Sequence, residues 1–91
     1  MTTTTTRTVL ITDLRESTDL RVRIGDGAFD ALRREHDRLL GEAAVAHGGE
    51  VVKGSGDGVI VLFGAAHEAI AASVAMQQVI AQHNARSADE L

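Results

Sequence analysis

Two aspartates are the residues of this 91-residue chain whose types and surroundings could support chemistry. Asp13 directly follows the β-branched, apolar run of residues 8–12, and Asp57 lies within the glycine-rich segment of residues 54–58. Two carboxylates brought to one point repel each other, and a divalent cation relieves that repulsion. Carboxylate oxygens, with a backbone carbonyl near Leu14 as a further ligand, suit Mg²⁺ or Mn²⁺. If the fold brings Asp13 and Asp57 together, they predict a divalent-cation site.

Each aspartate also has a simpler interpretation. An aspartate at the end of a strand often forms a turn or caps a helix. An Asp-Gly pair between two apolar strands often forms only a hairpin turn. The metal-site hypothesis therefore depends on the elements that place Asp13 beside Asp57.

The first half of the chain predicts one strand and two helices. Residues 8–12 form a buried strand, and a short helix follows that ends at the Gly-Asp-Gly segment of residues 25–27. The N-cap candidates of the short helix are Ser17, Thr18 and Asp19. A long helix comes next, because apolar residues recur at three- and four-residue spacings. That apolar face contains Phe29, Leu32, His36, Leu39, Leu40 and Ala43. The glycine pair after His47 predicts the end of this helix.

The second half predicts a β-hairpin followed by a helix. Residues 50–53 and 59–63 form the two strands, and residues 54–58 form the tight turn between them. Residues 66 to about 85 are helical. One side of this last helix contains Ala66, Ala69, Ile70, Val74, Gln77 and Ile80.

The order β-α-α-β-β-α predicts an α+β, ferredoxin-like fold that stops before its last strands. In that topology the first two strands are parallel, and the third lies antiparallel between them. Asp13 ends strand one and Asp57 begins strand three, so we expect the two carboxylates at one end of adjacent strands. The free edge of strand one should pair with a later strand and is otherwise open to association. Residues 59–63 are apolar on both faces, which indicates that a partner subunit or a later segment covers the face that the helices leave open.

Composition excludes several classes of function. The chain has no cysteine, tryptophan or tyrosine and a net charge of -4, which argues against nucleic-acid binding through aromatic stacking or phosphate contacts. No run is apolar for long enough to span a bilayer, and we expect a cytoplasmic location. Residues 1–6 are expected to be a disordered tail, residues 7–86 the domain, and residues 87–91 a frayed end.

Other polar residues have both a functional and an ordinary interpretation. The turn formed by Arg15, Glu16, Ser17 and Thr18 could cradle phosphate through its backbone amides, or could simply be a capped turn. Lys53 could contact a base or pair with a carboxylate, but it could also be a solvated lysine. We expect His36 to be a hydrogen-bonded histidine of the core or its edge rather than a metal ligand.

Two motifs resemble those of class III adenylate and guanylate cyclases. Residues 9–18, VLITDLREST, resemble the metal-binding strand and turn of that family, and residues 47–58, HGGEVVKGSGDG, resemble its second metal motif. The intervening Arg34-Glu35-His36-Asp37 lies at a suitable distance from both. The resemblance covers residue 8 to about residue 85.

The resemblance implies an adenylate cyclase-like, phosphorus-oxygen lyase activity in intracellular signalling. Asp13 and Asp57, with Leu14, would hold two Mg²⁺ or Mn²⁺ ions, and the turn of residues 15–18 would bind the triphosphate. Lys53 matches the family's purine-selecting lysine, which favours ATP over GTP. The products would be cyclic AMP and pyrophosphate, and the expected partner is a second copy or a complete cyclase domain.

Two departures from the family change what we expect. Glu16 stands where the family usually has a glycine, and the segment that carries the family's transition-state asparagine and arginine is not among these 91 residues. We therefore expect the chain alone to be weakly active or inactive. Two alternatives stay open: a non-catalytic dimerisation or regulatory cyclase-homology module, and a plain ferredoxin-like domain with a coincidental hairpin.

Overall fold

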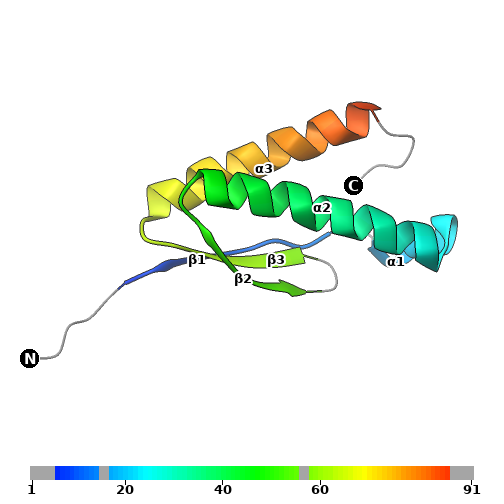
Figure 1. The fold of residues 1–91 in the computed structure, drawn as a ribbon, viewed down its shortest axis with the longest axis horizontal. Coiled ribbons are helices and arrows are strands. Elements are labelled where there is room, and N and C mark those ends of the chain that lie inside the picture. Colours follow the sequence, from blue (N-terminus) through cyan, green and yellow to red (C-terminus); the bar gives the residue numbers. More distant parts are fainter. Residues whose placement is uncertain (1–5, 15–16, 56–57, 87–91) are drawn as a thin grey trace, which may run out of the picture.

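The computed structural model describes residues 6–14, 17–55 and 58–86, which form three strands and three helices (Figure 1). The elements in chain order are β1 (Thr8–Ile11), α1 (Ser17–Ile24), α2 (Asp26–Ala46), β2 (Glu50–Ser55), β3 (Gly58–Phe63) and α3 (Ala66–Arg86). The predicted α+β class and the order β-α-α-β-β-α are confirmed.

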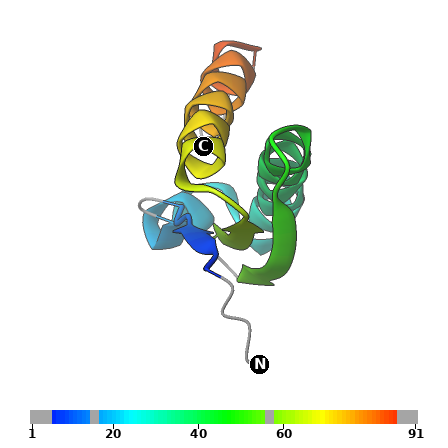
Figure 2. The same ribbon diagram turned by 90° about the vertical axis from the view of Figure 1, so that its left-hand side faces the viewer.

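The three strands form one sheet in the order β1-β3-β2. β3 runs antiparallel to both neighbours, so β1 and β2 are parallel to each other. This is the arrangement expected for the first three strands. Viewed from the end of the sheet, α2 and α3 lie on the same side of it (Figure 2). One face of the sheet is therefore covered by helices.

The β2–β3 hairpin is longer than predicted. The ladder continues to the Ser55–Gly58 pair, so Gly54 and Gly58 belong to strands rather than to a five-residue turn. The ladder also contains a bulge, because Val51 pairs with Val61 and Lys53 pairs with Ile60, which leaves residue 52 without a partner in β3. A bulge bends a strand and increases its twist.

Two glycines with positive φ end helical segments. Gly25, at φ 88°, separates α1 from α2, and Gly48, at φ 80°, follows the C-terminus of α2 as predicted. A side chain at residue 48 would also meet Glu68, because a Cβ there would lie 2.6 Å from Oε2 of that residue. The Glu68 carboxylate is the end of a flexible side chain and can move aside, so it is the positive φ that favours glycine at this turn.

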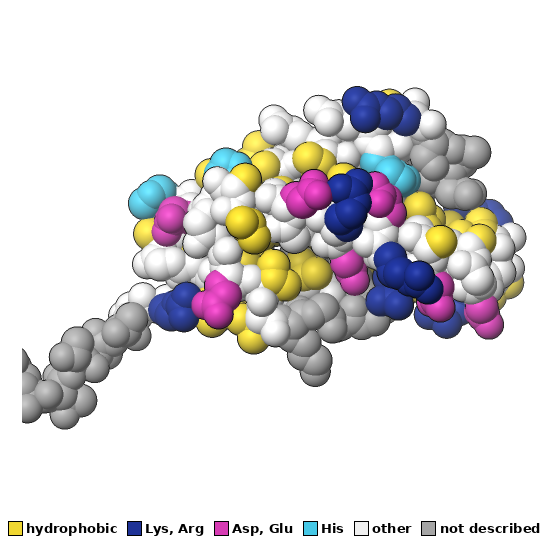
Figure 3. Space-filling model, in the orientation of Figure 1, with side chains coloured by type: hydrophobic (Ala, Val, Ile, Leu, Met, Phe, Trp, Pro, Cys, Tyr) yellow, Lys and Arg dark blue, Asp and Glu magenta, His cyan; other side chains and the backbone are white. Residues whose placement is uncertain are grey.

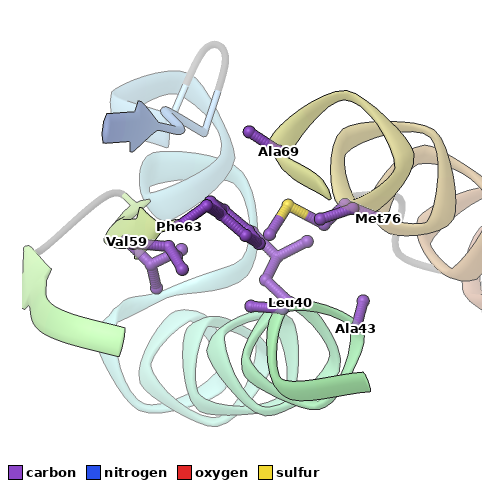
Figure 4. Close-up of a cluster of buried hydrophobic side chains, with 9 residues drawn as sticks. Leu40, Ala43, Val59, Phe63, Ala69 and Met76 are labelled. Carbon is purple, nitrogen blue, oxygen red and sulfur yellow. The ribbon is translucent and has the colours of Figure 1, made fainter. Parts of the chain in front are cut away.

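The main core lies between the sheet and the helices α2 and α3 (Figure 4). Phe63 and Val61 of β3 are completely buried, and Leu40 of α2 and Met76 of α3 close over them. A smaller cluster at the end of β1 joins Leu14, Leu20 and Phe29. The Arg21 guanidinium covers the Phe29 ring at 4.4 Å from its centroid, a cation–π contact that shields this cluster.

Only part of the side of α3 that the sequence groups together faces the core, where Ala69 is buried and Ile80 packs against the buried cluster. The structure buries Ala69, Ala72 and Met76, whereas Ile70 and Val74 are exposed by 65% and 52%. Small side chains on the buried face let the α3 backbone approach the sheet closely. The larger Ile70 and Val74 are consequently turned outward.

β3 is apolar on both faces, as predicted. Val59, Val61 and Phe63 are buried beneath the helices, while the alternate residues Ile60 and Leu62 are only partly buried. On the face of the molecule shown in Figure 3, acidic and basic side chains lie beside one another over α2. None of the helices in the described part of the chain has the length and apolarity needed to cross a membrane.

Candidate functional site

Thr12 determines how the chain leaves β1 and reaches Asp13. The Thr12 backbone N–H donates to the Val59 carbonyl at 3.0 Å, which continues the β1–β3 ladder by one residue. The Val59 N–H in turn donates to the Thr12 hydroxyl at 2.9 Å instead of to a backbone carbonyl. Because the side chain takes the place of the main-chain acceptor, the backbone is free to turn away from the sheet at Asp13.

Gly58 lies against this turn. A Cβ atom at residue 58 would overlap the Thr12 carbonyl oxygen and would lie 3.1 Å from the Cα of Asp13. Only glycine allows two backbones to approach this closely. The residue that follows Asp57 in the sequence is therefore in backbone contact with Asp13, at the end of the sheet where the sequence predicts the two carboxylates to meet.

Of the two predicted carboxylate ligands, the structure describes only Asp13, which is exposed. Asp57 lies outside the described residues. Among the residues that are described, no three histidine, cysteine or acidic side chains come together as a metal-binding group. The chemistry of the predicted donor set remains that of a site for a hard cation, with two carboxylates and a carbonyl oxygen.

Leu14 anchors the turn that follows Asp13. Its side chain is 6% exposed and packs with Leu20 and Phe29. This packing fixes the position of the backbone directly after Asp13. Ser17 begins α1 and is partly buried, and Thr18 is exposed. Arg15 and Glu16, the other two predicted phosphate-binding residues, lie outside the described residues.

Lys53 is placed by its backbone only, since its side chain is outside what the structure describes. In the register of the sheet, Lys53 pairs with Ile60, which pairs on its other side with Ile11. Lys53 thus shares a row with Ile11, two residues before Asp13. Lys53 is two strands away from Asp13, and its role in contacting a base stays a prediction.

A pocket of about 780 Å³ opens beside β1 and contains Asp13 in its wall. Leu10 and Met76 contribute apolar surface, and Asp19 and Arg23 of α1 contribute charge. This size is typical of small-molecule sites. The pocket lies between the end of β1, where Asp13 is, and residues of all three helices.

His36 also lines this pocket. Its side chain is buried, and Nδ1 lies 3.1 Å from Oδ1 of Asp37. The other carboxylate oxygen of Asp37, Oδ2, lies 3.7 Å from the Arg33 guanidinium. The prediction of a hydrogen-bonded core histidine is therefore confirmed. His83 of α3 differs, because its Nδ1 is buried without a partner among the described residues.

Reasoning from the sequence missed the roles of Thr12 and Gly58 in positioning Asp13. In the sequence, Thr12 and Gly58 were noted only as members of the two cyclase-like motifs, without a role of their own. The signal that could have identified Thr12 is a hydroxyl residue at the last position of an apolar strand, directly before an acidic residue. For Gly58 the signal is a glycine that begins a strand, where a close approach of another backbone is a common reason for its presence.

Comparison with known proteins adds no relative to this description. The sequence matches no protein-family model, and a search of curated proteins found no similar sequence.

Proposed function

We propose that this chain carries the metal-binding half of an adenylate cyclase-like site, with Asp13 and Asp57 as ligands of two divalent cations. The observation that carries the proposal is the close approach of Gly58 to the backbone of Thr12 and Asp13. If the two carboxylates come together they repel each other, and a divalent cation offsets that repulsion. The proposed reaction comes from the resemblance of residues 9–18 and 47–58 to the metal-binding motifs of the cyclases.

The donors suit Mg²⁺ or Mn²⁺ better than a softer metal. The candidate ligands are carboxylate oxygens and the Leu14 carbonyl, and the chain contains no cysteine. When bound, such ions offset negative charge on a triphosphate and on an attacking oxygen. The protein's contribution is to fix Asp13 through the Thr12 hydroxyl on one side and the buried Leu14 side chain on the other.

The proposed substrate is ATP. The backbone of residues 15–18, at the start of α1, would accept the phosphates, and Lys53 would contact the adenine. In the reaction, the ribose 3′-oxygen bonds to the α-phosphorus, the bond from that phosphorus to the bridging oxygen breaks, and the 3′-hydroxyl proton leaves to solvent. The products are cyclic AMP and pyrophosphate. Because the family's transition-state asparagine and arginine are not among these residues, we expect binding to exceed turnover.

The test is a measurement of Mn²⁺ and Mn²⁺-ATP binding by calorimetry, together with a cyclic AMP assay. We expect Asp13→Asn to weaken Mn²⁺ binding at least tenfold, that is, by about 1.4 kcal/mol or more. Asp19→Asn is the matched control, since Asp19 is an exposed carboxylate in the same pocket without the contact to Gly58. Equal effects of the two substitutions, or no Mn²⁺ binding by the unmodified chain, would remove the proposal.

A second candidate function is a non-catalytic module that associates with a complete cyclase domain. The observation that favours it is the exposed apolar surface of β1, where Val9 is 53% and Ile11 is 70% exposed. Co-purification of this chain with a complete cyclase domain, retained in Asp13→Asn, would support this function. Loss of co-purification in Asp13→Asn would instead show that the association depends on the metal site.

A further inference from the structure

The helices α2 and α3 lie side by side and run in opposite directions (Figure 1). At one end of the pair, Glu68 in the first turn of α3 has its carboxylate against Gly48, just beyond the end of α2. Near the middle, Ile80 of α3 packs against the buried cluster that contains Leu40 of α2. Because the two helices run in opposite directions, the turn of α2 before Leu40 lies level with the turn of α3 after Ile80.

At this level, Glu35 of α2 and His83 of α3 lie close to each other. Glu35 precedes Leu40 by just over one helical turn. His83 follows Ile80 by just under one turn. The electrostatics agree with this placement, because the hydrogen bond from Arg38, and more weakly the charge of His83, lower the pKa of Glu35 below its ordinary value. The pair therefore lies where the C-terminal end of α3 meets α2.

His83 has a ring nitrogen without a partner in the described part of the chain. This atom, Nδ1, is buried, and no described hydrogen-bonding group reaches it. A neutral imidazole has one donor and one acceptor nitrogen, whereas the protonated ring has two donors. Protonation therefore makes Nδ1 a donor, whichever tautomer the neutral ring has. A carboxylate beside the ring then becomes a favourable partner, because hydrogen bonds between charged groups are stronger than those between neutral groups.

The charged side chains on this side of α2 carry an excess of negative charge. Arg38 donates to Glu35 at 2.9 Å and to Glu42 at 2.8 Å, so two carboxylates share one guanidinium. Glu35 is the more covered of the two, with 38% of its side chain exposed against 65% for Glu42. A cation on α3 at the level of Glu35 would balance the remaining charge.

The other charged or titratable groups described near His83 do not offer it an acceptor. Nδ1 of His36, the buried histidine of α2, lies 3.1 Å from the Asp37 carboxylate, so both of these groups are already engaged. Arg86, almost one turn further along α3, is an exposed cation and has no acceptor atom in its side chain. Among these groups, Glu35 is the carboxylate that lies level with the unpartnered nitrogen.

We propose that His83 and Glu35 form an acid-dependent ion pair that holds the C-terminal end of α3 against α2. The ring takes a proton from solvent, and Nδ1 donates to the Glu35 carboxylate. Each carboxylate oxygen can accept two hydrogen bonds, so Arg38 keeps its place. Histidine is the side chain that ordinarily changes charge between about pH 8 and pH 5, so the contact forms as the pH falls through that range and is lost as it rises. This inference does not depend on the proposed cyclase activity.

Hydrogen exchange measured by NMR tests the contact in the unmodified protein. Rates at pH 5.5 and pH 7.5, each compared with the intrinsic rate at that pH, give protection factors. We expect the protection factors of the amides of residues 82–85 to be about two- to fivefold higher at pH 5.5, the effect of one exposed ion pair. The amides of residues 70–73, near the start of α3, should not gain protection. In about 1 M salt the gain should shrink, because the contact joins two charges.

Single substitutions identify the partners. His83→Gln removes the titrating group and Glu35→Gln removes the charge that it meets, so each should abolish the gain at pH 5.5, and the double variant should behave like either one. His67→Gln, at an exposed histidine of α3, and Glu42→Gln, at the other carboxylate bonded to Arg38, are matched controls that should keep the gain. Lower protection in acid, no change, or a gain that survives either of the first two substitutions would overturn the proposal. Loss of the gain in either control would overturn it as well.

Discussion

Gly58 and Thr12 are in backbone contact, so that a side chain on Gly58 would overlap the Thr12 carbonyl oxygen. This contact joins the two segments that contain the candidate metal ligands. Because of this contact, even one methyl group added at Gly58 should disturb the beginning of β3. Two consequences can be measured without any ligand: a loss of stability and a change in local hydrogen exchange.

The substitution Gly58→Ala should destabilise the protein. The added methyl group can be accommodated only if one backbone moves, and overpacking of this kind costs about 1–3 kcal/mol. The measurement is the free energy of unfolding from urea titration. Gly41→Ala is the matched control, because a Cβ at Gly41 meets nothing within 4 Å and the residue lies inside α2. That control should stabilise the protein by about 0.5–1 kcal/mol, so effects of the same sign would contradict the assigned contact.

The Thr12 hydroxyl should be required for the bond to the Val59 amide. Thr12→Val keeps the shape of the side chain but leaves the Val59 N–H without its acceptor, which should cost about 1–2 kcal/mol. Thr12→Ser keeps the hydroxyl and should preserve the bond. The decisive measurement is hydrogen exchange at Val59, which should become faster in the valine variant and stay slow in the serine variant. Equal exchange in both variants would show that the hydroxyl is not the acceptor.

Glu35 should make a small, pH-dependent contribution to stability. Its carboxylate accepts a hydrogen bond from Arg38 Nε at 2.9 Å, which lowers the pKa of Glu35 below its usual value and raises the pKa of Arg38. A carboxyl group whose pKa is lower in the folded state stabilises above its unfolded-state pKa, near 4.3 for a glutamate. That contribution disappears as the pH falls through the folded-state pKa.

Glu35→Gln should therefore lower the free energy of unfolding slightly at pH 7 and have no effect near pH 2. The pair is exposed, so the difference at pH 7 should also shrink in about 1 M salt, where charges are strongly screened. Urea titrations at the two pH values and two salt concentrations provide the measurement. A difference between the variants that persists at pH 2 would show that Glu35 acts through packing instead of charge.

Much of the fold could be predicted from the pattern of apolar residues. The alternating burial of β3 and the long apolar face of α2 are strong, regular signals, and the topology that follows from them places the start of β3 beside the end of β1. The predicted neighbourhood of Asp13 agrees with the structure as far as Gly58. The prediction that Asp57 completes the site stays a prediction, because that residue is outside the described part of the chain.

Other features depend on tertiary contacts that the pattern does not encode. The bulge at residue 52 arises in the pairing of β2 with β3, and a sequence that is apolar at residues 51 and 52 gives no sign of it. The role of Thr12 depends on Val59, which is 47 residues away. In α3, alanines are spread around the helix, so hydrophobicity alone could not separate the buried face containing Ala72 from the exposed side containing Ala71.

Ala72 and Ala71 provide a direct test of how α3 is rotated. Ala72 is completely buried against the sheet and α2, whereas its neighbour Ala71 is exposed. Valine at either position carries the same helix-propensity cost, so the difference between the two variants isolates packing. We expect Ala72→Val to cost about 1–3 kcal/mol more than Ala71→Val in urea titrations, because two methyl groups must enter a filled core. If Ala71→Val were the more damaging substitution, the face containing Ile70 and Val74 would be the buried one.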